Sequence, residues 1–240
     1  MNKKPLSIRC TVFTNRVIAF TPEISRSMLK ILGENLFMPV ILPVPFTPAV
    51  NGGSWELISS DSYLSILFDQ NKMDFVCDMQ IKPTVMSEFD IKKFIDFCVD
   101  NIGKIKDLLN CNFIRIAYSP QYEIEDASIT ELAEQFFKNT KFHDKEMTNY
   151  SMSNTFIKEE KVLDIPVEMN FLTNWSVAAR RYKSAALGIE SVQNVVVCTF
   201  DINTSPRQRI NYNMDAIIDF YEKVQSWDEE LMKNYLGARE

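Results

Sequence analysis

Alternating hydrophobic and polar positions mark out several β-strands in this chain, and their clearest group lies between residues 52 and 79. Two or three short β-patterned runs occur there, separated by the turn-forming stretches Ser-Ser-Asp-Ser and Asp-Gln-Asn-Lys. A double glycine precedes them, and Trp55 begins the first run. The apolar positions expected to share one face of a sheet are Leu57, Tyr63, Ile66, Phe68, Met73, Phe75 and Cys77.

Helical spacing of apolar residues flanks this region on both sides. Residues 22–35 form the first predicted helix, with Thr21 placed to cap it and Pro22 at its first position. Residues 91–109 form the second, because their apolar side chains recur at intervals of three and four. Each helix needs a sheet face to cover.

Two further strands complete the first half of the chain. They are predicted at residues 6–14 and 112–119, and Pro120 is expected to end the second. The resulting order is strand, helix, strand, strand, helix, strand, which is the ferredoxin-like split βαβ order. We therefore expect residues 1–124 to form a ferredoxin-like α+β half.

The second half, residues 125–240, is predicted to have the order α-β-β-β-α. Ser128 and Glu131 can form a capping box for its first helix. Residues 182–193 are predicted as a connection with room for a short helical turn. The strands and the final helix are predicted at residues 150–157, 167–179, 195–202 and 213–236. We expect an α+β protein with a mostly antiparallel sheet, whose two halves pack as one compact unit.

Charge and cysteine usage narrow the classes of function. The net charge of −6 disfavours non-specific binding of nucleic acid, which requires a basic field. The five cysteines are widely spaced, without a C-x-x-C pair, and this favours free buried thiols in a reducing compartment. No signal peptide and no apolar run of ~18 residues is present. The sequence thus indicates a cytoplasmic protein without a membrane partner.

A proline-rich apolar stretch covers residues 38–48. Its four prolines exclude a helix and a central strand, so an extended segment on apolar surface is expected. The alternative is a segment displayed to a partner. On that alternative, Pro43, Pro45 and Phe46, together with Trp55, are the candidate residues for protein interaction.

The sequence contains few candidate residues for enzymatic catalysis. His143 is the single histidine, and no zinc-type cluster, nucleophile motif or phosphate-binding glycine loop occurs, so no cofactor is expected. A carboxylate enzyme using Mg²⁺ would draw on Asp201, Asp61 or Asp74. Alternation places Asp74 on a solvent-facing side of its strand, and a turn role fits Asp61 and Asp201 equally well.

The basic residues concentrate in two places. Arg180 and Arg181 lie at the end of the long strand-patterned run, and Arg207 and Arg209 follow Pro206. Depending on strand pairing, these pairs lie near one another or at opposite ends of two strands. Either arrangement leaves a local anion or nucleic-acid contact as an alternative to solvated strand ends.

A family resemblance spans most of the chain. It rests on Trp55-Glu-Leu-Ile-Ser-Ser-Asp, on Ile114-Arg115-Ile116-Ala117-Tyr118 after a long helix, and on Thr199-Phe-Asp201-Ile before the terminal helix. These segments resemble a sporadically distributed group of uncharacterised bacterial proteins of similar length. In that group the second segment usually reads Arg-Tyr-x-Asn, whereas here Arg115 and Tyr118 are separated. The resemblance implies no activity, but a sporadic distribution suits an accessory component of a mobile or phage-defence locus.

Three hypotheses follow from the sequence. The first is a non-enzymatic interaction subunit of a bacterial multiprotein system, with a protein partner or a homo-oligomer. The second is the carboxylate enzyme using Mg²⁺. The third is a nucleic-acid or nucleotide sensor that uses the four arginines.

Overall fold

The computed structural model describes residues 3–18, 21–33, 37–41, 55–80, 91–124, 151–183 and 190–236. Within them nine strands form one sheet in the order β2-β3-β4-β5-β1-β6-β9-β8-β7, and each neighbouring pair is antiparallel. The strands are β1 (Lys3–Thr14), β2 (Phe37–Ile41), β3 (Trp55–Ser59), β4 (Leu64–Asp69), β5 (Lys72–Asp78), β6 (Phe113–Ile124), β7 (Ser151–Val162), β8 (Ile165–Lys183) and β9 (Glu190–Thr204). The predicted α+β class and antiparallel sheet are confirmed.

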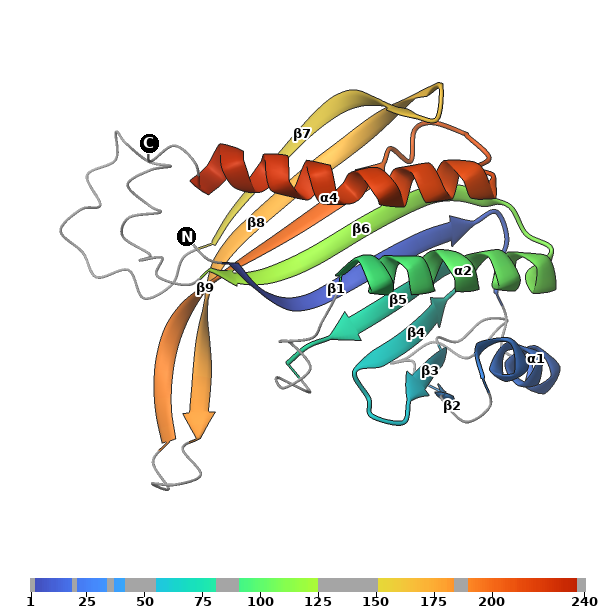
Figure 1. Ribbon diagram of the computed structural model, residues 1–240, viewed down its shortest axis with the longest axis horizontal. Coiled ribbons are helices and arrows are strands. Elements are labelled where there is room, and N and C mark those ends of the chain that lie inside the picture. Colours follow the sequence, from blue (N-terminus) through green and yellow to red (C-terminus); the bar gives the residue numbers. More distant parts are fainter. Residues whose placement is uncertain are drawn as a thin grey trace.

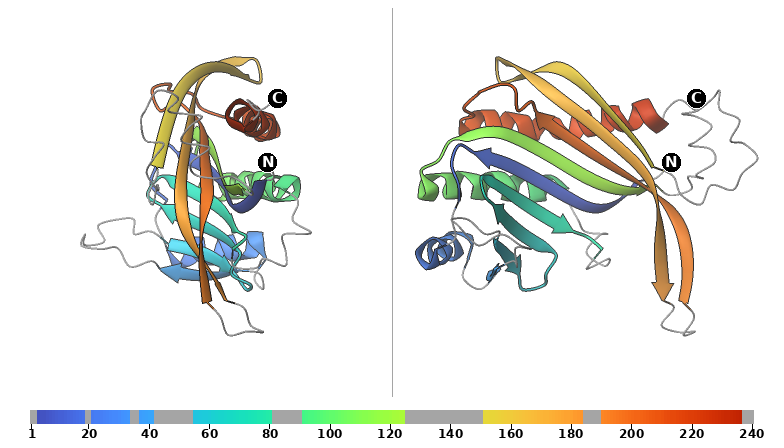
Figure 2. Two further views of the ribbon diagram at one scale, coloured as in Figure 1. Left: turned by 90° about the vertical axis from the view of Figure 1, so that its left-hand side faces the viewer. Right: turned by 180° about the vertical axis from the view of Figure 1, so that it is seen from behind.

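Three helices accompany the sheet in the described residues: α1 (Pro22–Leu32), α2 (Ile91–Leu109) and α4 (Met214–Leu236). The two long helices, α2 and α4, lie on the same face of the sheet (Figures 1 and 2). The opposite face of β1, β6 and β9 has no described helix over it (Figure 2). No helix in the described part of the chain is both long and apolar enough to cross a bilayer.

The main core lies between the sheet and this helical layer. Alternation along β1 places Ile8, Cys10 and Val12 in it, all fully buried. The phenolic hydroxyl of Tyr221, in the middle of α4, donates to the backbone carbonyls of Thr11 and Ala117 at 3.1 and 3.2 Å. This contact fixes α4 against the two central strands.

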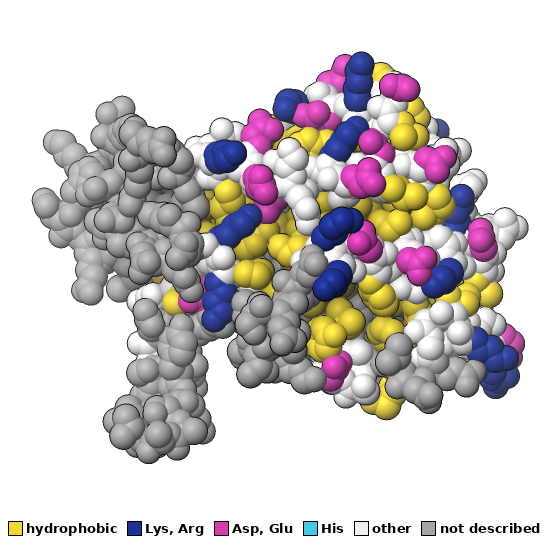
Figure 3. All heavy atoms as spheres, in the orientation of Figure 1, with side chains coloured by type: hydrophobic (Ala, Val, Ile, Leu, Met, Phe, Trp, Pro, Cys, Tyr) yellow, Lys and Arg dark blue, Asp and Glu magenta, His cyan; other side chains and the backbone are white. Residues whose placement is uncertain are grey.

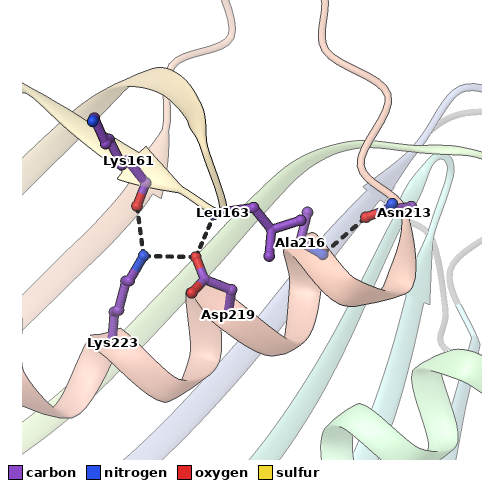
Figure 4. Close-up of polar contacts among 6 residues, drawn as sticks. All are labelled: Lys161, Leu163, Asn213, Ala216, Asp219 and Lys223. Atoms are coloured by element: carbon purple, nitrogen blue, oxygen red, sulfur yellow. Dashed lines mark hydrogen bonds and ion pairs between the residues drawn. The ribbon is translucent and has the colours of Figure 1, made fainter.

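The helices begin where their capping residues predict. Thr21 Oγ1 accepts a hydrogen bond from the Ile24 N–H at 3.1 Å, and α1 starts at Pro22. In α4, Asn213 Oδ1 accepts from the Ala216 N–H at 2.9 Å (Figure 4). The three helices predicted over these residues are confirmed, although α1 ends at Leu32, a few residues early.

The turn between β7 and β8 is fastened to α4 (Figure 4). Leu163 has a φ of 52°, in the left-handed region that a leucine rarely adopts. Its N–H donates to Asp219 Oδ2 at 2.5 Å, and Lys223 Nζ donates to the same oxygen at 2.7 Å and to the Lys161 carbonyl at 2.8 Å. The turn residue with the strained backbone is therefore held by the helix.

Prolines occupy the sheet in two different ways. Pro39 lies in β2, the strand at one end of the sheet, where a missing N–H is tolerated. Pro120 does not end its strand as predicted, because β6 continues to Ile124. Residue pairing between β6 and β9 skips Ser119 and Pro120, so the missing donor falls in a gap of that ladder.

The order of the strands differs from the predicted one. Four strands, and not two, lie between α1 and α2, so the ferredoxin-like split order is not confirmed. The sheet continues across the predicted boundary at residue 124, because β6 pairs with β9. The five cysteines are free and buried, as predicted. The helix predicted from Ser128, and His143, lie outside the described residues.

Candidate functional site: the β8–β9 arm

The β8–β9 pair extends beyond the rest of the sheet. β6 last pairs with β9 at Val196, and β7 first pairs with β8 at Ser176. Six further residue pairs, from Ala178–Val195 to Lys183–Glu190, continue without a described strand on either side. We call residues 178–183 and 190–195 the β8–β9 arm. It projects away from the body of the molecule (Figures 1 and 2).

The length of the arm has an energetic consequence. At about 3.3 Å per residue, six residue pairs extend about 20 Å. A two-stranded ribbon that packs on nothing is at best marginally stable in water. Within the described part of the chain, no strand pairs with either edge of the arm, and the ribbon has little support beyond its root.

At its root, the arm packs against a residue of a β-bulge in β1. The pairing of β1 with β6 shifts between Pro5 and Ser7, so Leu6 is an additional residue in its strand. Leu6 packs with Val195 and Val197 in a small buried cluster separate from the main core, and Ala178 borders this cluster. The bulge turns an apolar side chain towards the point where the arm leaves the sheet.

The described arm side chains beyond this root are exposed. Val192 is 63% exposed, and Ala179 and Asn194 are also exposed. By sequence the arm carries three cationic residues and one anionic residue, Arg180, Arg181, Lys183 and Glu190, for a net charge of +2. Since the whole chain has −6, the remainder has −8.

The surface of the body is different in character. On the face that bears α2 and α4, cationic and anionic side chains alternate over both helices (Figure 3). Interspersed charges of this kind are typical of a solvated surface. The arm is thus distinguished by its shape and its positive charge together.

The structure separates the two arginine pairs. Arg180 pairs with Gln193 in the arm, whereas Met169 pairs with Thr204 eleven residues earlier in β8. This offset is about 36 Å along the strand. Arg207 and Arg209 follow Thr204, so they lie at the end of β9 opposite the arm. The four arginines therefore do not form one binding site.

Of the other candidate residues for protein interaction, one is buried in the core and three lie outside the described part of the chain. Trp55 is completely buried, and its ring stacks on Phe68 with centroids 3.9 Å apart. It belongs to the core and is not accessible to a partner in this structure. Pro43, Pro45 and Phe46 lie outside the described residues.

The carboxylates considered for Mg²⁺ do not converge. Asp74 is fully buried, where a solvent-facing position was predicted, because Thr11 Oγ1 donates to its Oδ1 at 2.5 Å and Lys72 Nζ lies 2.8 Å from its Oδ2. Asp201, in β9, accepts a hydrogen bond from Ser119 Oγ at 3.2 Å. Its strand lies three strands from that of Asp74, which is about 14 Å across the sheet. Asp61 accepts from Ser59 Oγ at 2.9 Å near the β3–β4 turn.

No metal-binding group emerges from this arrangement. The described residues contain no cluster of three or more histidine, cysteine or acidic side chains that could hold a metal ion. The buried position of Asp74 reflects a structural hydrogen bond and ion pair, which alternation along one strand does not reveal. The carboxylate hypothesis therefore lacks a common site in this part of the chain.

The arm itself was not identified from the sequence. Residues 182–193 were expected to be a connection with a helical turn, whereas β8 continues to Lys183 and β9 begins at Glu190. The predicted strands at residues 167–179 and 195–202 stop short of the arm, whereas the observed β8 and β9 have 19 and 15 residues and are longer than the 12-residue strands β6 and β7 beside them. Only the pairing of β8 and β9 with their neighbouring strands shows that their additional residues project from the sheet.

The fold and the arm together define a class of protein: an α+β protein with one antiparallel sheet and a projecting two-stranded ribbon. Comparison of the chain with protein-family models and with curated proteins found no match. No family is therefore assigned, and the function is proposed from the geometry.

Proposed function

We propose that this protein is a non-enzymatic interaction subunit that binds another protein chain through the β8–β9 arm. The observation that carries the proposal is the six-pair ribbon that continues after the neighbouring strands end. Among the described residues the ribbon packs at its root, and a ribbon of this length gains little stability from its own two strands. Contact with a second molecule would supply the missing burial.

The chemistry of the arm indicates the kind of contact. Its unpaired strand edges offer backbone N–H and C=O groups to an added strand. Its exposed Val192 offers apolar area, and its arginines offer charge-assisted hydrogen bonds to carboxylates. The proposed occupant is therefore a protein surface that is acidic and can approach a strand edge.

A second copy of this chain is the first occupant to consider. The remainder of the chain carries −8 against +2 in the arm, so the arm of one copy and the body of another are complementary in charge. A closed dimer would satisfy both arms by the same contact. A different acidic protein in a bacterial assembly is the alternative form of the same proposal.

The wider context of the proposal comes from the sequence resemblance. An accessory subunit of a mobile or phage-defence locus would need a docking element and no active site. Free buried cysteines suit a cytoplasmic location, where thiols stay reduced. For the fold, we propose an elaborated ferredoxin-like half, supported by the adjacency of β4, β5, β1 and β6 together with α1 and α2.

Removal of the arm tests the proposal. Residues 179–194 are replaced by Asn-Gly, so that the paired residues Ala178 and Val195 flank a two-residue turn that suits a hairpin. The molar mass of the purified wild-type and arm-less chains is measured by light scattering, with thermal unfolding to verify that the body remains folded. A wild-type dimer and an arm-less monomer are expected.

If the wild-type chain is a monomer, both chains serve as bait in extracts of the native cell at low salt. A protein recovered at stoichiometric amount by the wild type, and lost from the arm-less chain, is then expected. Equal recovery by both chains contradicts the proposal. Recovery of nucleic acid in place of protein also contradicts it, because a two-stranded ribbon with arginines fits a nucleic-acid groove as well.

A further inference from the structure

A cavity of about 620 Å³ lies at the end of the sheet opposite the arm. Its walls come from the end of β1, the β4–β5 turn, the start of β6 and the segment between β9 and α4. The residues that matter here are Phe13, Asn71, Arg115, Gln208, Arg209 and Asn211. The described lining residues include two guanidinium groups and no carboxylate, although the whole chain is acidic.

Hydrogen bonds hold Arg115 in place, and several of its N–H donors remain unused. Its guanidinium lies 4.7 Å from the centroid of the Phe13 ring. Nε donates to the Thr204 carbonyl at 3.1 Å, and Nη2 donates to Asn203 Oδ1 at 2.8 Å. Asn203 Oδ1 also accepts from Asn170 Nδ2 at 3.0 Å, which fixes the orientation of that amide. Three of the five N–H groups of Arg115 remain without a partner among the described residues.

The electrostatics of Arg115 favour an anion. Burial lowers the pKa of its guanidinium, and nearby Asp201 partly counteracts this. An arginine side chain in a protein nevertheless stays protonated. Its positive charge is therefore partly desolvated, and an anion that reaches its free N–H groups would be bound more strongly than at an exposed site.

The walls of the cavity are fixed by hydrogen bonds. Thr14 donates from both its N–H and its hydroxyl to the Asn71 carbonyl, at 2.7 and 3.1 Å. Gln208 Oε1 accepts from the Glu168 N–H at 2.7 Å, and the Tyr212 N–H donates to the Phe113 carbonyl at 2.8 Å. The cavity is therefore preformed, as small-molecule sites usually are.

The remaining polar groups point to a ligand with several acceptors. The side-chain amides of Asn71 and Asn211 make no hydrogen bond within the described residues, and Gln208 retains its NH₂ donors. Arg209 is exposed and forms no ion pair in the described part of the chain. Phe13 adds apolar surface to the lining, and one face of its ring is covered by the Arg115 guanidinium.

We propose that this cavity binds an organic phosphate of mononucleotide size, with Arg115 and Arg209 on the phosphate. Guanidinium groups recognise phosphate oxygens in a bidentate manner. The cavity volume lies within the range of about 300–1,000 Å³ that small-molecule sites occupy, and inorganic phosphate alone would leave most of it unfilled. The amide groups and the aromatic wall would contact the base and the sugar.

Titration calorimetry with AMP, CMP, GMP, UMP, ribose 5-phosphate and inorganic phosphate tests the proposal. We expect at least one mononucleotide to bind more tightly than inorganic phosphate. Arg209→Ala is expected to weaken that binding about tenfold or more, since a charge-assisted contact is lost. Arg207→Ala is the matched control, because Arg207 is two residues away, is exposed and does not line the cavity.

Several results would overturn the proposal. One is the absence of heat with all six ligands at millimolar concentration. Another is equal weakening by Arg209→Ala and Arg207→Ala. A third is inorganic phosphate binding as tightly as every mononucleotide. Because Arg209 is exposed, its substitution leaves the fold intact, and Arg115→Lys then tests the bidentate contact separately. The arm-less chain should bind the same ligand unchanged, so this proposal and the proposed function fail independently.

Discussion

Tyr122 in β6 and Asp228 in α4 are joined by a hydrogen bond of 2.6 Å between the phenolic hydroxyl and Oδ2. Lys3 Nζ lies 2.7 Å from the same carboxylate oxygen. Asp228 is almost completely buried, while Lys3 is partly exposed. One carboxylate thus ties the final helix to the beginning of β1 and to the central strand beside it.

Asp228→Ala should therefore destabilise the protein by about 2–3 kcal/mol, because it leaves the Tyr122 hydroxyl and the Lys3 ammonium without their partner. Urea unfolding measures the change in the free energy of unfolding. Glu229→Ala is the matched control, since Glu229 is the next residue of α4 and is exposed. A loss for Asp228→Ala no larger than that of the control would show that the contact contributes nothing.

Alkaline pH should destabilise the fold. Burial raises the pKa of Tyr118, Tyr122 and Tyr221 well above 10.0, and it raises the pKa of Cys77 from 9.0 to about 12. These groups stay neutral in the folded chain, whereas the unfolded chain ionises near pH 9.0 and 10.0. Their contribution to stability is thus complete below pH 9 and is lost as the pH rises towards the folded-state values.

Thermal unfolding measured from about pH 7 to about pH 11 checks this expectation. The midpoint should be nearly constant in the lower part of the range and fall progressively above pH 9. Cys77→Ala should reduce the alkaline slope, because it removes one of the titrating groups. A midpoint that stays constant up to the highest pH would disagree with the burial of these side chains.

Asp219→Ala should loosen the β7–β8 turn. The substitution removes the acceptor of the Leu163 N–H and the ion-pair partner of Lys223 (Figure 4). Because the groups are partly exposed, a loss of about 1–2 kcal/mol is expected. Hydrogen exchange at the Leu163 amide should accelerate, and Glu222→Ala, on the same helix and exposed, should leave that rate unchanged. Unchanged exchange in Asp219→Ala would mean that α4 does not hold the turn.

Local signals along the chain predict much of this fold. The hydroxyl of Thr21 and the proline after it define the start of α1, and periodic apolar residues define α2 from residue 91 to residue 109. Alternation of apolar residues from Ile8 to Val12 identifies β1. In each of these cases the determining interactions lie within one turn or one strand.

The features that were missed depend on pairing between distant strands. Asp74 is buried because Thr11 and Lys72 lie beside it. Pro120 is accommodated inside β6 because the ladder with β9 has a gap there. The arm exists because β6 and β7 end before β8 and β9 do. Alternation shows which side chains share a face, but it shows neither what covers that face nor where a neighbouring strand stops.

The arm is the central element of the account, and reversal of its charge is the most direct test. Sedimentation velocity is compared for the wild type, the double variant Arg180→Glu/Arg181→Glu, and the double variant Arg207→Glu/Arg209→Glu. Both variants change the charge equally, but the second changes it at the end of β9 opposite the arm. We expect a wild-type dimer that dissociates in the first variant and persists in the second. A dimer that persists in both variants, or that dissociates in both, would contradict the proposed role of the arm. If the wild-type chain is a monomer, the three chains are compared as bait in extracts of the native cell, and equal recovery of protein by all three, or none by the wild type, would contradict it.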